Sequence, residues 1–229
     1  TLMLKKNIDV VVIGGGPAGI SACLELDKLS DFSVSLFESD HELGGIPRSC
    51  HIFFGMRDLK RFYSGKVYAD KLEEKLRKTG VAINTNSTVL RITPGESGRR
   101  HLVTVATSEG IAQYHCRYII GAMGCFESSR QARLIPGYRP AGIFTTGSLQ
   151  KMIHLNHVIP GKKAVIIGSE IVSFSSAMTL KKGGVKLLGM IEEQSTVQSS
   201  KFVAGVMKSW YDFPILTGTN VVSILGENR

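Results

Sequence analysis

Apolar positions near the start of the chain follow first a strand pattern and then a helix pattern. The run Val10–Ile13 is apolar at every position, which is typical of a parallel strand buried on both faces. Over Gly19–Leu29, apolar side chains such as Ile20 and Leu24 recur at helical spacing, and Ser33–Phe37 is a second apolar stretch. The pattern predicts a strand, a helix and a second strand in succession, the βαβ unit of a parallel sheet.

Glycines at the first strand-to-helix turn have the spacing G-x-G-x-x-G. Gly14 would permit the tight turn, Gly16 would let a pyrophosphate approach the backbone, and Gly19 would let the helix pack closely on the strand. The second apolar stretch ends in Glu38, whose carboxylate can accept hydrogen bonds from both hydroxyls of an adenosine ribose. Together these residues predict a bound dinucleotide, with an ordinary glycine-rich turn as the alternative.

The start of the predicted helix adds to this interpretation. Pro17 suits an early helical position because its missing N–H costs nothing there, and Ala18 has a backbone N–H that can be donated to a ligand. The unpaired N–H groups and the positive end of the helix dipole would point at the phosphate.

The middle of the chain predicts one more helix and several short strands. Residues 66–79 have Tyr68, Leu72 and Leu76 on one face, which indicates an amphipathic helix with Gly80 as its C-cap. The strands that follow, two of them forming a hairpin, are predicted at Val81–Asn84, Val89–Thr93, Leu102–Thr107, Ile111–Arg117 and Tyr118–Ala122.

The opening pattern recurs after a Pro/Gly-rich passage, Ile135–Gly147. We predict a strand, a helix, a strand ending in an acid, a further helix and its exit to which Trp210 and Phe213 belong, and a last strand. The first strand is predicted at Lys163–Ile167 and the first helix at Val172–Lys182. The second strand is Val185–Ile191, followed by the acid Glu192, and the last strand is Asn220–Leu225. The domains are therefore predicted as residues 1–147 and 148–229.

Composition narrows the class of protein. The chain has 229 residues, of which 43% are hydrophobic and 21% charged, and these values fit a folded globular protein. The net charge of +9 raises nucleic acid as a partner, but the basic residues are scattered in pairs without interleaved aromatics, so we expect none. The charge instead suits solubility and attraction to an anionic cofactor or to an acidic protein partner. No apolar stretch is long enough to span a bilayer and no signal peptide is recognised, so a cytoplasmic location is the default expectation.

Cysteine and histidine spacing disfavours metal and disulfide chemistry. The four cysteines, Cys23, Cys50, Cys116 and Cys125, contain no C-x-x-C pair. His154 and His157 lie three positions apart, without a neighbouring carboxylate or thiolate. We therefore expect no metal site.

With two βαβ units in this order, the chain resembles the pyridine nucleotide-disulfide oxidoreductase superfamily of two-dinucleotide-domain flavoproteins. The resemblance implies an α/β fold: a Rossmann-like FAD-binding domain of three-layer ββα character, and a second, incomplete Rossmann-like domain of the NAD type. Glu38 matches the ribose acid, and Gly45 with Arg48 matches the loop that runs along the FAD. Gly124 closes a strand end like the family's Ala-Thr-Gly, with Met123 in place of the threonine. Arg48 would then contact the diphosphate, unless it is a solvated loop arginine.

Three segments make the chain similar to one branch of that superfamily, namely residues 44–48, 54–57 and 139–147. The branch contains the sarcosine oxidase alpha subunit, hydrogen cyanide synthase, opine and dye-linked proline dehydrogenases, and flavoproteins found beside anaerobic glycerol-3-phosphate dehydrogenase. It implies an FAD-dependent oxidoreductase subunit that passes hydride from a small amine, imino acid or polyol to an acceptor. A second flavoprotein subunit or a homo-oligomer would be its partner. The alternative is a nucleotide-binding scaffold without turnover.

Departures from the family pattern change these expectations. No second cysteine follows Cys50 closely, so a redox-active disulfide is not expected. In the second unit, Glu170 and Ser173 replace the second and third glycines after Gly168, and a glutamate would put bulk and negative charge where a pyrophosphate should lie. This disfavours NAD(P), although Glu192 can still hold an adenosine ribose in a ligand with a different phosphate route. A vestigial domain kept for packing is the other alternative.

The ends of the chain suggest that it is one part of a longer protein. The family closes its FAD site with a carboxyl-terminal Gly-Asp segment, and no such segment follows Glu192. The first residue, Thr1, is not a methionine. We therefore expect a fragment or a truncated product.

Overall fold

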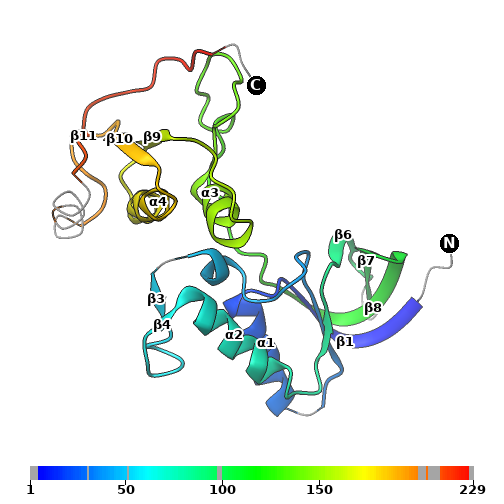
Figure 1. Cartoon of the computed structure of the whole chain (residues 1–229). Coiled ribbons are helices and arrows are strands. Elements are labelled where there is room, and N and C mark those ends of the chain that lie inside the picture. The colour runs from blue at the N-terminus through cyan, green and yellow to red at the C-terminus, as the bar shows by residue number, and fades with distance from the viewer. Residues whose placement is uncertain are drawn as a thin grey trace. The chain divides into compact units, whose positions relative to one another are not determined.

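The computed structural model of the chain describes residues 5–29, 31–50, 52–96, 100–200, 205 and 212–226. It divides into two compact units (Figure 1). The first comprises Thr1–Arg48 and Phe53–Cys125, and the second comprises Ser49–Ile52 and Phe126–Arg229. The structure thus groups the passage before residue 147 with the second unit, because Gly137 pairs with Ile224 in an isolated bridge. Each unit is described by itself below.

A six-stranded sheet in the order β5-β2-β1-β8-β7-β6 forms the centre of the first unit. The strands β5, β2, β1 and β8 are mutually parallel, whereas β7 pairs antiparallel with both β8 and β6. In chain order the strands are β1 (Lys5–Ile13), β2 (Val34–Phe37), β5 (Ala82–Asn84), β6 (Thr88–Thr93), β7 (His101–Thr107) and β8 (Gly110–Gly121).

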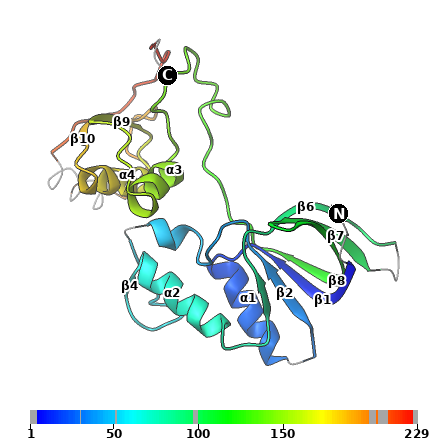
Figure 2. The same cartoon turned by 45° about the vertical axis from the view of Figure 1, so that its right-hand side comes forward.

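Side chains of the central strand β1 alternate between two cores. Val10 and Val12 pack with Ile20 of α1 (Pro17–Lys28) and Leu72 of α2 (Gly65–Leu76). On the other face, Val11 and Ile13 pack with Val103, Val105 and Tyr114 of the antiparallel strands. Figure 2 shows the two helices beside the parallel strands and the curved β6–β7–β8 ribbon. The first unit therefore has the predicted α/β architecture in three layers.

Two predicted boundaries in the first unit are wrong. Ile111–Arg117 and Tyr118–Ala122 belong to one strand, β8, because its pairing with β1 runs without a break from Lys5↔Gln113 to Ile13↔Gly121. The second helix ends at Leu76 with Arg77 as its C-cap rather than at residue 79. Gly80 lies beyond the helix, where its backbone N–H donates to the carboxylate of Asp27 at 3.0 Å.

Short elements connect the larger ones in the first unit. A two-stranded antiparallel sheet forms from β3 (Phe53–Phe54) and β4 (Tyr63–Ser64). The 3₁₀ turn η1 spans Ile46–Ser49, within a segment predicted to be loop. These elements precede α2 and lead the chain from β2 to that helix.

The second unit contains the repeated βαβ element. A parallel sheet in the order β11-β10-β9 is covered by α4, around buried Phe174, Leu180 and Met190. Its elements are α3 (Thr146–Gln150), the π-helical turn η2 (Lys151–Leu155), β9 (Lys163–Ile167), α4 (Ile171–Lys182), β10 (Lys186–Ile191) and β11 (Ile215–Leu216).

The third strand of this sheet is not the predicted one. Ile215–Leu216 pairs with Met190 and Ile191 of β10, whereas the predicted strand 220–225 forms only the bridge at Ile224. The apolar side chain of Val222 is 83% exposed, so alternation of apolar residues there does not reflect burial. Phe213 is buried, and Trp210, predicted with it in a later helix and its exit, lies outside the described residues.

Candidate functional site

The turn between β1 and α1 depends on two glycines that have no room for a side chain. Gly14 has a φ of +104°, and a Cβ there would overlap the carbonyl oxygen of Ala122. A Cβ at Gly19 would overlap the carbonyl oxygen of Gly14. The predicted roles of both residues, a tight turn and a close approach of helix to strand, are confirmed by these contacts.

Gly16 differs from the other two because it faces open space. It is the N-cap of α1, with a φ of −76° and a ψ of −179°, and no heavy atom lies within 4 Å of a Cβ built on it. No side chain caps the helix, Pro17 begins it, and Ala18 is exposed. The first turn of α1 therefore presents backbone N–H groups and the positive end of its dipole at an accessible surface, which suits an anion.

Glu38 lies beside this turn, as the sequence predicts. Because β2 pairs with β1, Phe37 lies next to Ile13 and the residue after it reaches the glycines. One carboxylate oxygen, Oε2, accepts a hydrogen bond from the backbone N–H of Gly15 at 2.7 Å. The other, Oε1, accepts from the N–H of Asp40 at 2.8 Å. The carboxylate is half-buried and held in one orientation, with lone pairs left for a further donor.

The loop after β2 packs against the glycine turn. The backbone N–H of Gly44 donates to the carbonyl oxygen of Gly15 at 2.8 Å. Gly45 has a φ of +57°, and a Cβ there would lie 3.0 Å from the Cα of Gly16. Gly45 thus borders the open surface at Gly16, and its lack of a side chain keeps that surface accessible.

Arg48 is neither solvated nor free to move. Its side chain is 6% exposed, and its guanidinium donates to the Asp40 carboxylate at 3.1 Å and to the Glu42 carboxylate at 2.6 Å. It also donates to the carbonyl oxygen of Glu42 at 3.3 Å. The guanidinium therefore braces the loop that borders the turn, and its contact with a diphosphate stays a prediction. Sequence analysis missed both acids, although their positions six and eight residues earlier were a signal.

Ala122, rather than Gly124, contacts the turn. The Ala122 N–H donates to the carbonyl oxygen of Ile13 at 2.8 Å, which places the end of β8 beside the end of β1. Gly124 has a φ of +74°, is exposed and has no heavy atom within 4 Å of a Cβ position. It is accessible to a ligand, and its predicted contact with a cofactor stays a prediction.

The four cysteines all lie in the described part of the chain and all are free thiols. Cys23 is buried, and burial raises the pKa of its thiol to about 12. The Cys50 thiol lies 3.9 Å from the hydroxyl of Ser175 in the second unit. Among the described residues no group of three or more His, Cys, Asp and Glu side chains could hold a metal ion.

Comparison with known proteins identifies counterparts of this arrangement. The family described as pyridine nucleotide-disulphide oxidoreductase matches residues 8–229. Hydrogen cyanide synthase subunit HcnB of Pseudomonas protegens is 30% identical over 194 residues, which are 81% of this chain and 38% of HcnB. An opine oxidase subunit of Rhizobium meliloti is 25% identical over 186 residues, 80% of this chain and 38% of that relative. Both relatives belong to the predicted branch, and the chain spans about 38% of their length.

Solved structures confirm the fold. Thioredoxin reductase of Lactococcus lactis aligns with a TM-score of 0.74 over 96% of this chain and 68% of the reductase, at 16% identity. The family and its structural neighbours are FAD- and NAD(P)-binding flavoproteins. In the described part of the chain, none of the helices has the length and apolar character required to span a membrane.

Replacing Gly19 by Ala should lower the free energy of unfolding by about 1–3 kcal/mol, because α1 must move away from β1 to admit the methyl group. Urea unfolding followed by circular dichroism measures this. Gly80→Ala is the matched control, since its Cβ would meet only the Asp27 carboxylate at 3.7 Å. Equal stability of the Gly19 variant and the wild type would contradict the close approach described here.

Replacing Arg48 by Gln should lower the free energy of unfolding by about 1–2 kcal/mol, because it removes the buried guanidinium and its hydrogen bonds to Asp40 and Glu42. The loss is limited because both carboxylates can partly regain water. The matched control is Lys28→Gln, which removes an exposed ion pair with Glu25 and should change stability by less than about 1 kcal/mol. Urea midpoints compare the two. A loss no larger for Arg48 than for Lys28 would show that Arg48 does not brace the loop.

Proposed function

Because the chain belongs to the pyridine nucleotide-disulphide oxidoreductase family, we propose that it is the FAD-binding part of an FAD-dependent oxidoreductase subunit. The subunit passes hydride or electrons from a small donor to an acceptor. Its family and its relatives are oxidoreductases, and the first unit has the βαβ element that such proteins use for an adenine dinucleotide.

The observation that carries the proposal is the open surface at Gly16. It lies at the N-terminus of α1, where N–H groups favour a diphosphate, and the oriented Glu38 carboxylate lies at the end of the adjacent strand, where a ribose would follow. Gly45 keeps the surface accessible on its other side. These residues fit the adenosine diphosphate half of FAD.

The protein and the cofactor have different tasks in this proposal. FAD, when bound, supplies the hydride-accepting ring. Gly16, Pro17 and Ala18 form the diphosphate surface, Glu38 orients the ribose, and Arg48 holds the neighbouring loop in place. No residue of this chain is assigned as a general base.

The donor belongs to the amine, imino acid or polyol class. The amine and imino acid classes rest on the relatives, which are named as a hydrogen cyanide synthase subunit and an opine oxidase subunit, whereas the polyol class rests on the sequence resemblance alone. Both names denote subunits, so a second flavoprotein subunit is the proposed partner. We further propose that no redox-active disulfide takes part, because no second cysteine follows Cys50 closely in the sequence.

Replacing Gly16 by Glu should weaken FAD binding at least a hundredfold, about 2.7 kcal/mol, because a carboxylate would occupy the diphosphate surface. The fold should persist, since the side chain enters open space and an acid near a helix N-terminus is favourable. Flavin absorbance after reconstitution measures binding, and the melting temperature reports the fold.

Gly161→Glu is the matched control. It adds the same carboxylate at a glycine whose Cβ would meet only the carbonyl oxygen of Lys163, at 4.0 Å, so it should leave FAD binding unchanged. Full FAD occupancy in the Gly16 variant would overturn the proposed site. The scaffold alternative would be favoured if the wild-type protein binds adenine nucleotides but its flavin is not reduced by any donor of the proposed classes.

A further inference from the structure

The second strand-to-helix turn repeats the backbone of the first. Gly168 has a φ of +105°, against +104° for Gly14. Glu170 is the N-cap of α4 with a φ of −71° and a ψ of 169°, and Gly16 is the N-cap of α1 with nearly the same angles. The two turns therefore offer the same backbone surface, and they differ in what covers it.

The Glu170 side chain covers the second turn. Its Oε2 accepts a hydrogen bond from the Ser173 hydroxyl at 3.1 Å and lies 2.5 Å from the position of a Cβ on Gly168. The carboxylate thus folds back over the glycine, at the N-terminus of a twelve-residue helix. A negative charge there takes the favourable interaction that a phosphate would make, and it repels a second anion.

The acid at the end of β10 is also engaged. Glu192 is 5% exposed, and it accepts hydrogen bonds from the Ser169 hydroxyl and, at 2.8 Å, from the N–H of Gln194. Burial acts to raise the pKa of Glu192, but these hydrogen bonds together hold it below the ordinary value. Its counterpart in the first turn, Glu38, accepts a similar set of hydrogen bonds, from the backbone N–H groups of Gly15 and Asp40 and, at 3.1 Å, from the Ser39 hydroxyl, but it is only half-buried.

We propose that Glu170 closes the second turn to NAD(P), with the chain's own carboxylate in the place of the dinucleotide phosphate. The family binds NAD(P), but the residues of this turn do not fit it: the Glu170 carboxylate occupies the phosphate surface, and the ribose acid, Glu192, is buried. The electron acceptor of this chain is then not a nicotinamide dinucleotide bound at this turn. The inference concerns the second unit alone and holds whether or not the first turn binds FAD.

Restoring the glycines tests the proposal. Purified wild-type protein should bind NADH and NADPH too weakly to detect by calorimetry at millimolar concentration, whereas Glu170→Gly/Ser173→Gly should gain affinity by at least tenfold. Glu170→Gln keeps the bulk of the side chain and removes its charge, so its affinity for NADH and NADPH should rise less than that of the double variant. The matched control, Glu193→Gln, removes one exposed carboxylate near the turn and should gain nothing.

Two results would overturn the proposal. One is wild-type binding of NAD(P)H that Gly16→Glu leaves intact, since it would come from the second turn. The other is a double variant that melts like the wild type and still binds neither nucleotide. The Glu170→Gly/Ser173→Gly change should also raise NAD(P)H affinity when it is combined with Gly16→Glu. That result would assign the added binding to the second unit, whether or not the first turn binds FAD.

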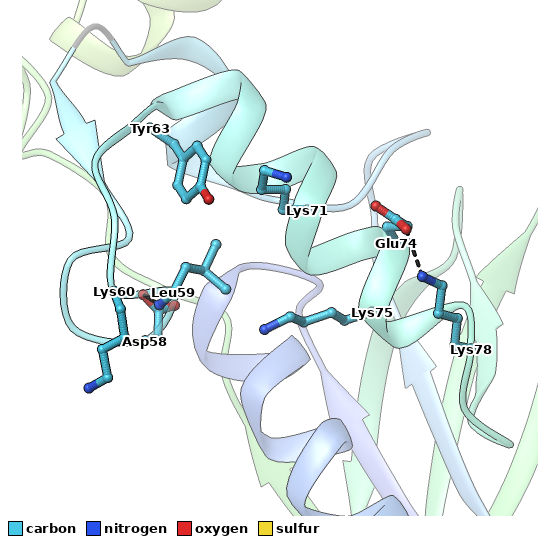
Figure 3. A pocket seen from close by; sticks show the side chains of 8 residues that line it. All are labelled: Asp58, Leu59, Lys60, Tyr63, Lys71, Glu74, Lys75 and Lys78. Atoms are coloured by element: carbon cyan, nitrogen blue, oxygen red, sulfur yellow. Dashed lines mark hydrogen bonds and ion pairs between the residues drawn. The ribbon is translucent and has the colours of Figure 1, made fainter.

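A different observation concerns a lysine-lined hollow in the first unit. It has a volume of about 380 Å³ and lies between α2 and the loop before β4, as Figure 3 shows. Its lining side chains are Asp58, Leu59, Lys60, Tyr63, Lys71, Glu74, Lys75 and Lys78. Four lysines therefore line the hollow together with two carboxylates.

Both carboxylates in the hollow already have partners. Glu74 pairs with Lys78 at 2.6 Å, and Asp58 accepts a hydrogen bond from the Tyr68 hydroxyl at 2.6 Å. Lys71 lies over the ring of Tyr63, 5.1 Å from its centroid, and within the described part of the chain neither Lys71 nor Lys75 has an ion pair. Like charges at positions i and i+4 destabilise an isolated helix, so Lys71 and Lys75 lower the stability of α2 when no anion lies between them.

We infer that the hollow binds the phosphate group of a small molecule. A phosphate dianion would balance the two ammonium groups left without a carboxylate, and the Tyr63 ring with Leu59 offers an apolar wall to the rest of the ligand. The positive potential also acts on Glu74, whose pKa is lowered by the hydrogen bond and charge of Lys78 and, to a smaller extent, by Lys71.

Inorganic phosphate is the probe, titrated into FAD-saturated protein at low ionic strength. Lys71→Gln/Lys75→Gln should weaken phosphate binding at least tenfold. The control Lys66→Gln changes a lysine of the same helix that pairs with Asp70 outside the hollow, and it should have no effect. Three results would each overturn the inference. The wild type does not bind phosphate, both variants lose the same phosphate affinity, or an acidic peptide binds more tightly than phosphate.

Discussion

The contact between α1 and β1 at Gly19 and Gly14 is the constraint on which the first unit depends. With no Cβ at either glycine, the helix begins directly above the end of the strand, and the carbonyl oxygens of Gly14 and Ala122 lie where side chains would otherwise be. The approach fixes the direction of the helix N-terminus. That direction decides which surface receives the unpaired N–H groups, and Gly16 leaves this surface open.

Strand order adds the remaining parts of the site. Since β1 lies between β2 and β8, the carboxyl ends of three parallel strands meet at the glycine turn. Glu38 reaches the turn from β2 and Ala122 from β8, and the loop after β2 returns to it through Gly44 and Gly45. Ligands of open α/β sheets bind at this edge, outside the carboxyl ends of the strands. The buried Arg48 then limits the movement of the loop.

Features that depend on neighbouring residues could be predicted from the sequence. The β1 run, the glycine spacing and the acid at the end of β2 are local patterns, and all three lie where they were expected. The unbroken length of β8 and the identity of β11 could not be predicted, because each is decided by pairing with a strand distant in sequence. The role of Arg48 was missed although its partners, Asp40 and Glu42, lie only eight and six residues earlier, because these ion pairs are side-chain contacts that no backbone pattern reveals.

The two strand-to-helix turns show how little of a nucleotide site resides in the backbone. Gly14 and Gly168 have nearly the same φ, both helices have twelve residues, and an acid follows each second strand. The difference begins at one N-cap position, glycine in the first turn and glutamate in the second. Because a helix N-terminus favours an anion of either origin, a carboxylate on the chain satisfies it as a phosphate would. The same backbone turn can therefore form with either a phosphate or a carboxylate of the chain at its N-terminus.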